Sequence, residues 1–313
     1  MKLLPLILAL VWLKGNVHTH TLESDGDVPP AEVAQWYRAH GYDFLVITDH
    51  DKITRIDAPP GLLLIPGEEV TDRLPKKPLH VNALGLRSVV VPQHGATTVE
   101  NLQKNIDAVR EAGGVPLVNH PNFGWAFGAE ELKQLDHAAL FEIASGHPLI
   151  NSLGPPSTEE MWDELLTSGK RWYGVAVDDS HHFKCPPPPD AEAALPGKAW
   201  VVVRVEKAEA KMILDALEHG EFYASTGVEI GDYAVTDTTM TVTIRVPAGS
   251  SAPRYRTEFI GANGRVLAST GANPAAYTFR GDERYVRARV TDSNGKHAWL
   301  QPMFIAGSRA PSH

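Results

Sequence analysis

Short runs of apolar residues alternate with segments of helical periodicity between about residues 15 and 227. Each run is apolar almost throughout, as expected for strands that are buried on both faces of a parallel sheet. Segments 30–40 and 98–112 have helical spacing and end at glycines, which are typical helix stops. The alternation predicts an α/β fold with a parallel sheet or barrel. The predicted strands are 13–17, 44–47, 62–65, 81–84, 115–118, 140–143 and 173–177.

The pattern changes after Gly227, where polar and apolar residues alternate with period two and helical spacing is absent. Segment 239–246 is the clearest example, and Asn263-Gly264 and Asn294-Gly295 are typical of hairpin turns. This part of the chain is therefore predicted to form a small β-sandwich.

The first thirteen residues have the features of a short secretory leader. Lys2 precedes an apolar run over residues 3–13, which is too short to span a bilayer. We therefore expect export to the periplasm or the extracellular space, and no stable membrane span. The alternative is a cytoplasmic protein in which the end of this run is simply the first buried strand.

Composition restricts the partners and the kind of metal site. The net charge of −9 is spread along the chain without a basic run, so long nucleic acid is not an expected partner. The single cysteine, Cys185, permits no internal disulfide and cannot build a thiolate metal site alone. Any bound metal must be held by histidines and carboxylates.

Side chains that can bind metals follow the apolar runs. His18 and His20 alternate after the first run, so both imidazoles point to one side, as two ligands of one metal must. Other such groups are Asp49-His50, Glu68-Glu69, Asn119-His120 and Asp178 to His182, with His80 near the start of a further strand. One histidine after a strand is usually a capping residue, but many ionisable groups at one end of a barrel are costly to bury unless protons or metals neutralise them. The pattern predicts a metal site.

The order of these motifs resembles the polymerase and histidinol phosphatase (PHP) family of metal-dependent phosphoesterases. The motifs that carry the resemblance are His18-Thr19-His20, Ser24-Asp25-Gly26, Thr48-Asp49-His50, Gly67-Glu68-Glu69, His80, Asn119-His120-Pro121 and Asp179-Ser180-His181. The resemblance implies a distorted (β/α)7 barrel over residues 14–228, and the β-sandwich of unknown role would follow over 229–306.

The resemblance also implies a metal-ligand set. His18, His20, Glu69 and Asp179 would hold one metal, and Glu69 would bridge to a second metal held with His80 and His120. Asp25, His50 and His181 would hold a third. The family spacing selects Glu69 over Glu68 and Asp179 over Asp178. We expect two to three divalent ions, Mn, Zn or Fe, with Asp25 favouring a hard metal at the third position.

The expected activity is hydrolysis of a small-molecule phosphoester, either a monoester or a diester. A hydroxide shared by two metals would attack phosphorus directly, so Glu69 and Asp179 are assigned to catalysis as well as to metal binding. His147 and His182 are further catalytic candidates that would contact the substrate or protonate its leaving group. Supporting or surface roles remain the alternative for both histidines.

Two other functions fit the sequence. Metal-hydroxide barrels of this general kind serve several reactions, so the scissile bond could instead be an amide, a lactone or a sulfate ester. The protein could also be a non-catalytic binding protein, although the complete ligand set argues against that alternative.

Overall fold

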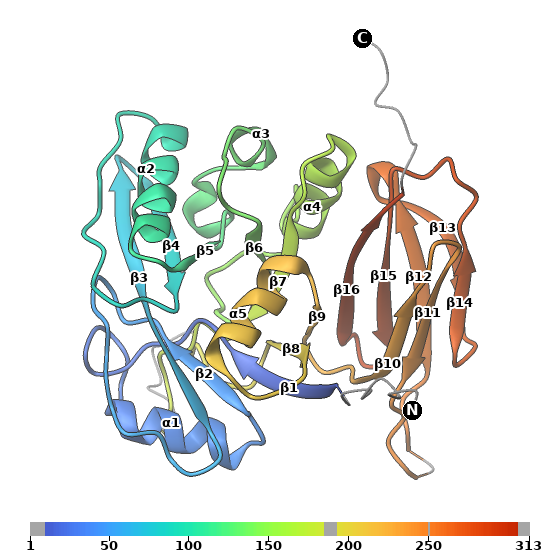
Figure 1. Ribbon diagram of the computed structural model, residues 1–313, viewed down its shortest axis with the longest axis horizontal. Coiled ribbons are helices and arrows are strands. Elements are labelled where there is room, and N and C mark those ends of the chain that lie inside the picture. The colour runs from blue at the N-terminus through green and yellow to red at the C-terminus, as the bar shows by residue number, and fades with distance from the viewer. Residues whose placement is uncertain (1–9, 185–192, 250, 306–313) are drawn as a thin grey trace, which may run out of the picture.

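The computed structural model describes residues 10–184, 193–249 and 251–305 (Figure 1). Most of the predicted leader, Cys185 and residue 306 lie outside the described residues. Among the described residues, no helix is long and apolar enough to cross a membrane.

The N-terminal two thirds of the chain alternate strands and helices in the predicted order. These elements are β1 (Val11–Asn16), α1 (Pro30–Ala39), β2 (Phe44–Ile47), β3 (Leu63–Leu74), β4 (Lys77–Leu84), α2 (Thr98–Glu111), β5 (Val115–Val118), η1 (Phe123–Trp125), α3 (Ala129–Leu132), β6 (Leu140–Ser145), α4 (Thr158–Thr167), β7 (Tyr173–Val177), β8 (Trp200–Val205), α5 (Ala210–His219) and β9 (Phe222–Ser225). The predicted bounds of β2, β5 and β7 are confirmed.

The strands from β1 to β7 pair in chain order. Pairing is parallel at β1–β2, β2–β3, β5–β6 and β6–β7, and antiparallel at β3–β4 and β4–β5. The far ends of this series also meet, because the backbone N–H of Asp179 donates to His18 O (3.0 Å) and that of His20 donates to Ser180 O (2.9 Å). The fold is therefore a mixed α/β arrangement. Closure into a seven-stranded barrel stays a prediction.

The remaining strands either extend this sheet or form a second one. They are β10 (Ile230–Val235), β11 (Thr239–Ile244), β12 (Tyr255–Gly261), β13 (Arg265–Thr270), β14 (Ala275–Thr278), β15 (Tyr285–Asp292) and β16 (His297–Phe304), with η2 (Ala262–Gly264) between β12 and β13. β8 and β9 pair antiparallel beside β1, and β9 pairs with β16, which continues through β15 and β12 to β13. β10, β11 and β14 form a separate three-stranded sheet. In Figure 1 this sheet lies beside β12, β13, β15 and β16, at the right of the molecule.

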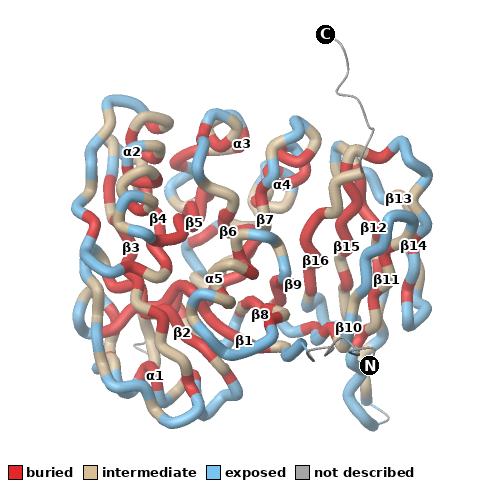
Figure 2. The backbone as a smooth tube through the Cα atoms, in the orientation of Figure 1, coloured by how far each residue is buried: buried red, intermediate tan, exposed pale blue. Residues whose placement is uncertain are grey.

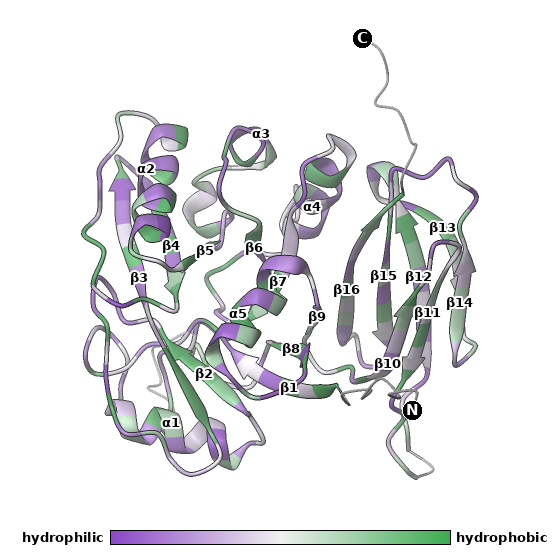
Figure 3. Cartoon of the chain, in the orientation of Figure 1, coloured by the Kyte–Doolittle hydropathy of each residue, from purple (hydrophilic) through white to green (hydrophobic). Residues whose placement is uncertain are grey.

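Buried residues concentrate along the strands (Figure 2). The four residues of β2 are apolar and buried, and Figure 3 shows that strand as hydrophobic over its length. A second core of buried residues, including Val242, Phe259 and Val290, lies between the three-stranded sheet and the strands that it faces. The C-terminal segment thus has its own apolar interior. That it forms an independent domain stays a prediction.

One side chain links the C-terminal strands to the open edge of β7. Gln301 in β16 accepts a hydrogen bond from the Gly174 amide and donates one to the Gly174 carbonyl, both at 2.9 Å. Both side chain and backbone are buried, so these bonds satisfy polar groups that would otherwise be costly to bury. The contact holds the C-terminal strands against the part of the sheet that carries the candidate site.

Candidate metal centre

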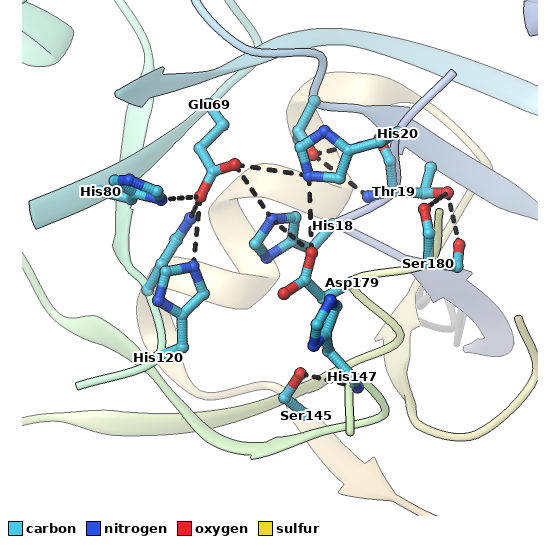
Figure 4. Close-up of polar contacts among 12 residues, drawn as sticks. His18, Thr19, His20, Glu69, His80, His120, Ser145, His147, Asp179 and Ser180 are labelled. Carbon is cyan, nitrogen blue, oxygen red and sulfur yellow. Dashed lines mark hydrogen bonds and ion pairs between the residues drawn. The ribbon is translucent and has the colours of Figure 1, made fainter. Parts of the chain in front are cut away.

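His18 and His20 lie just beyond the end of β1, and both are fully buried. The backbone bonds to Asp179 and Ser180 hold this segment against the end of β7, and the side chains of Thr19 and Ser180 add a 2.6 Å hydrogen bond (Figure 4). Strand-like alternation leaves both imidazoles on the same side. The two rings are 5.2 Å apart between centroids.

Glu69 in β3 is the centre of the cluster and has an exposed fraction of 1%. Its Oε2 lies 3.5 Å from His18 Nε2 and 3.3 Å from His20 Nε2. Its Oε1 lies 2.9 Å from His80 Nδ1 and 3.3 Å from His120 Nε2. Oε2 also lies 3.1 Å from His50 Nδ1. The two carboxylate oxygens thus face different sets of histidines, with His18 and His20 on one side and His80 and His120 on the other in Figure 4, as a bridging ligand would.

Asp179, at the end of β7, faces the first of these pairs. Its Oδ1 lies 3.2 Å from His18 Nε2 and 3.4 Å from His20 Nε2. The backbone of Asp179 is left-handed, with φ of 48°, a conformation that non-glycine residues rarely adopt outside functional turns.

A third group forms around Asp25, beside the first. Asp25 Oδ2 lies 3.3 Å from His50 Nε2, and Oδ1 lies 3.4 Å both from His181 Nε2 and from His20 Nδ1. The candidate ligand atoms of these four residues lie within 4.8 Å of one another, and the same holds for His18, His20 and Asp179 and for His18, Glu69 and His120. The structure therefore brings together all nine side chains that the sequence analysis assigned to metals.

Unpartnered atoms in the cluster fit a metal ion. His18 Nε2 and His20 Nε2 are buried and have no hydrogen-bond partner, although carboxylate oxygens face them. Buried polar atoms are almost always satisfied, and an imidazole nitrogen beside carboxylates is a common ligand of divalent metals. The set of imidazoles and carboxylates suits a divalent metal ion.

Electrostatics in the cluster favour positive charge. Burial alone would lower the pKa of His20, but the facing carboxylates of Asp179 and Glu69 outweigh it and raise that pKa to about 9. Burial likewise opposes charge on Glu69, yet His80 and His18 hold its pKa well below the usual range. Carboxylates in this potential stay ionised, so the centre attracts cations, either protons or metals.

The two neighbours that the sequence analysis rejected point elsewhere. Glu68 is buried, accepts a 2.5 Å hydrogen bond from the Val90 amide, and has its pKa raised to about 7 by burial. Asp178 accepts hydrogen bonds from Tyr37 Oη (2.8 Å) and from the amides of residues 197–199. Both carboxylates therefore fix loops around the centre and leave Glu69 and Asp179 to face it.

His147 and His182 line a cavity of about 220 Å³ above the cluster, together with Asp25, His181 and Phe123. The amide of Leu149 donates to His147 Nδ1 (3.1 Å), and the amide of Ala194 donates to His182 Nδ1 (3.2 Å). These bonds place the proton of each neutral ring on Nε2. Each ring therefore has Nε2 available as a donor.

The sequence analysis missed Glu142, which supports two of the ligand segments. Glu142 in β6 is 1% exposed, and its Oε1 lies 2.6 Å from His18 Nδ1. Its Oε2 accepts a 3.0 Å hydrogen bond from the His120 amide. A carboxylate that orients a metal-binding imidazole through its other nitrogen is a common supporting feature of metal sites. The available signal was a lone acidic residue inside an otherwise apolar strand.

Comparison with solved structures identifies the fold, whereas comparison with protein-family models assigns no family. No protein-family model matches the chain. An uncharacterized protein of Methanocaldococcus jannaschii is 28% identical over 159 residues, which cover 44% of this chain and 72% of that protein. A lesion-specific endonuclease of Pyrococcus furiosus matches with a TM-score of 0.43 and 13% identity, over 67% of this chain and 56% of that one.

The comparison that covers both parts of the chain is a solved structure from Bacteroides vulgatus. It is a two-domain protein that contains a predicted PHP-like metal-dependent phosphoesterase, and it matches with a TM-score of 0.51 and 16% identity. The match covers 93% of this chain and 95% of that one. The chain therefore has a PHP-like fold, in agreement with the order of its sequence motifs.

Proposed function

We propose that this protein is a metal-dependent hydrolase of phosphoester bonds, with a centre of two or three divalent ions. The observation that carries the proposal is the pair of buried, unpartnered imidazole nitrogens of His18 and His20, which face Glu69 and Asp179. A purely structural cluster would be expected to satisfy these atoms internally.

Each group of side chains has a distinct task in this proposal. His18, His20, Glu69 and Asp179 would hold one ion, Glu69 with His80 and His120 a second, and Asp25, His50 and His181 a third. When bound, such ions supply an activated water and positive charge for the phosphoryl oxygens. The protein keeps its carboxylates ionised for this purpose, since the histidines lower the pKa of Glu69.

His147 and His182 would contact the substrate as hydrogen-bond donors. Burial lowers the pKa of His147 to about 4, so its ring is neutral near pH 7. With Nδ1 occupied by the Leu149 amide, the Nε2 proton of His147 is free to bond a phosphoryl or leaving oxygen. A neutral donor stabilises developing negative charge without first having to gain a proton.

The volume of the cavity limits the size of the substrate group that it can hold. A volume of about 220 Å³ is below that of typical pockets for drug-sized ligands, which begin at about 300 Å³. It suits one phosphoryl group, with the remainder of the substrate outside. We therefore favour monoesters over diesters. Export of the protein, which its N-terminal residues suggest, remains part of this proposal.

Elemental analysis paired with hydrolysis assays tests the proposal. Protein purified without chelator should contain two or three Mn, Fe or Zn ions per chain and should hydrolyse a chromogenic phosphomonoester faster than the corresponding diester. Stripping the metals, or the substitution His18→Ala, should abolish hydrolysis, whereas His219→Ala, on the exposed end of α5, should not change it. Metal-loaded protein that is inert on both esters would rule out phosphoester hydrolysis and favour another scissile bond.

A further inference from the structure

A second, larger cleft opens directly beside the metal cavity. Its volume is about 740 Å³, and it shares His80 and Phe123 with the smaller cavity that contains the cluster. A group held at the metals could therefore continue past these two side chains into the larger cleft. The outer walls of the cleft come mainly from the tip of the β3–β4 hairpin and from residues 92–94.

One face of the β3–β4 hairpin extends from the metal cluster into this cleft. Glu69, Thr71 and Arg73 alternate along β3 and so lie on one face of the strand. Thr71 is paired with His80 in the hairpin, which places His80 on that same face. Arg73 lies four positions after Glu69, and at about 3.3 Å per residue this places Arg73 about 13 Å along the strand from the Glu69 backbone.

Cations gather at the tip of the hairpin. Arg73 and Lys76 are exposed, line the cleft, and have no side-chain hydrogen bond or ion pair among the described residues. Lys77, which also lines it, has only a 3.4 Å hydrogen bond to Thr98 Oγ1. These groups present unneutralised positive charge at the far end of the cleft.

The two carboxylates of the cleft are already engaged. Asp72 accepts hydrogen bonds from the His94 amide (3.0 Å) and from Asn105 (3.2 Å), and it pairs with His94 Nδ1 at 2.9 Å. Asp51 Oδ1 accepts a 2.8 Å hydrogen bond from the Thr71 amide. Neither carboxylate has an ion pair with a cation of the hairpin tip among the described residues. Apolar side chains of Leu74, Pro78, Pro92 and Phe123 line the cleft between its two ends.

We propose that the larger cleft binds the leaving-group side of the substrate, and that this side carries a second anionic group. In this arrangement one phosphoryl group lies at the metals, an uncharged linking segment passes Phe123 and Pro78, and a distal phosphate or carboxylate pairs with Arg73, aided by Lys76. Arginine suits this role because its guanidinium binds such groups through two parallel hydrogen bonds. The inference rests on the proposed function, because it assigns the substrate class of the same centre.

A homologous series of alkanediol bisphosphates, from propane to octane, tests this proposal against alkyl monophosphates of equal length. Hydrolysis adds water to one phosphorus, breaks its bond to the alkyl oxygen, and releases inorganic phosphate and a hydroxyalkyl phosphate. The bisphosphates should have a lower KM by about tenfold, which corresponds to about 1.4 kcal/mol. The advantage should peak at one chain length, since the distance between the metals and Arg73 is set by the hairpin.

The substitution Arg73→Gln should remove most of the bisphosphate advantage through KM while leaving kcat and the hydrolysis of monophosphates nearly unchanged. Arg73→Lys should retain part of it. Arg265→Gln is the matched control, because Arg265 is an exposed arginine of β13 outside both cavities. Equal KM values for both series in the wild-type protein would overturn the inference and leave phosphoester hydrolysis intact.

Binding measurements separate the two proposals if no ester is hydrolysed. Alkanediyl bisphosphonates, which cannot be hydrolysed, should bind to the metal-loaded protein more tightly than alkyl monophosphonates, and Arg73→Gln should abolish the difference. That result would support the cleft as a site for a second anion even if the protein does not hydrolyse phosphoesters. Equal affinities would overturn the inference whatever the reaction is.

Discussion

His20 shows how a single residue couples the metal centre to the stability of the fold. It is fully buried, and the facing carboxylates of Asp179 and Glu69 outweigh burial to raise its pKa to about 9 in the absence of metal. An unfolded histidine has a pKa of about 6.5. The folded protein therefore binds this proton more tightly than the unfolded chain does, and metals must displace it.

The metal-free protein is expected to lose stability as the pH rises. A folded pKa above the unfolded value gives stability that is fully present below about pH 6.5 and is lost as the pH rises through about 9. The loss should be on the order of 3 kcal/mol. Chemical denaturation at several pH values would measure it. In metal-loaded protein His20 is already deprotonated, so the trend should vanish, and a flat profile without metal would contradict the assignment.

Glu142 makes a second test at the scale of one residue. Glu142→Gln keeps the shape of the side chain but removes the charge that faces His18 Nδ1 at 2.6 Å. Loss of such a supporting group typically weakens metal binding by about 10-fold to 100-fold. Competition with a fluorescent chelator would measure the affinity. Glu258→Gln, on the C-terminal strand β12, should leave it unchanged, and equal affinities in both variants would show that Glu142 only fills space.

At the scale of the elements, the sequence predicted the buried strands well and the long hairpin poorly. Only 62–65 and 81–84 were predicted as strands, whereas β3 and β4 extend over Leu63–Leu74 and Lys77–Leu84. The extension is polar because one of its faces carries Glu69 and Arg73 toward the candidate site and the cleft, so it lacks the apolar pattern of a buried strand. The polar residues on this face are the reason why the hydrophobic pattern did not predict the full length of β3.

Pairing between distant segments was also beyond sequence reasoning. β8 and β9 were not among the predicted strands. The antiparallel pairing of β8 with β1 joins residues nearly two hundred positions apart, as in the pair Trp12 and Arg204. The nine candidate ligands, by contrast, were named from the resemblance to PHP motifs, most of which follow strand ends. The structure brings these side chains together, and their role as metal ligands stays a prediction. Glu142 was missed because its role depends on which strand lies beside His18.

The loop after β1 depends on one buried carboxylate. Asp49 Oδ1 accepts hydrogen bonds from the Thr21 amide (2.7 Å) and Ser24 Oγ (2.8 Å), and Oδ2 accepts from the hydroxyls of Thr21 and Thr54. The loop between β1 and α1 carries Asp25, whose carboxylate lies 3.3 Å from His50 Nε2. Asp49 itself is not in the metal cluster. Asp49 would therefore influence metal binding only by holding the loop that carries Asp25 in place.

Asp49→Asn is expected to remove one metal ion and leave the others. The amide would present a donor where four donors converge, which should cost about 1–3 kcal/mol of folding stability and release the loop that carries Asp25. Elemental analysis would report the loss. Asp25→Ala should remove the same ion with little effect on stability, because its side chain is half exposed. Loss of all ions in Asp49→Asn would mean that the loop also holds the two inner positions.

At the scale of the whole molecule, a buried ionic cluster joins the two parts of the chain. Arg287 in β15 is 1% exposed, and its guanidinium donates to both oxygens of Asp163 in α4 at 2.8 and 2.6 Å. Tyr285 Oη donates to Asp163 at 2.7 Å, and Glu159 forms an ion pair with Arg287 at 2.8 Å. The contact adds to the pairing of β9 with β16 and to the Gln301 contact on β7. The two parts should therefore unfold together.

Arg287→Met tests this coupling, because it leaves Asp163 buried without its partner. Removing one member of a buried pair costs about 3–5 kcal/mol, whereas Arg289→Met, at a partly exposed pair, should cost about 1 kcal/mol or less. Calorimetry should show one transition that shifts to lower temperature in Arg287→Met, while the number of bound metals stays that of the unmodified protein. Two separate transitions in the unmodified protein would show that the C-terminal strands fold independently, and the cluster would then be a local contact between autonomous units.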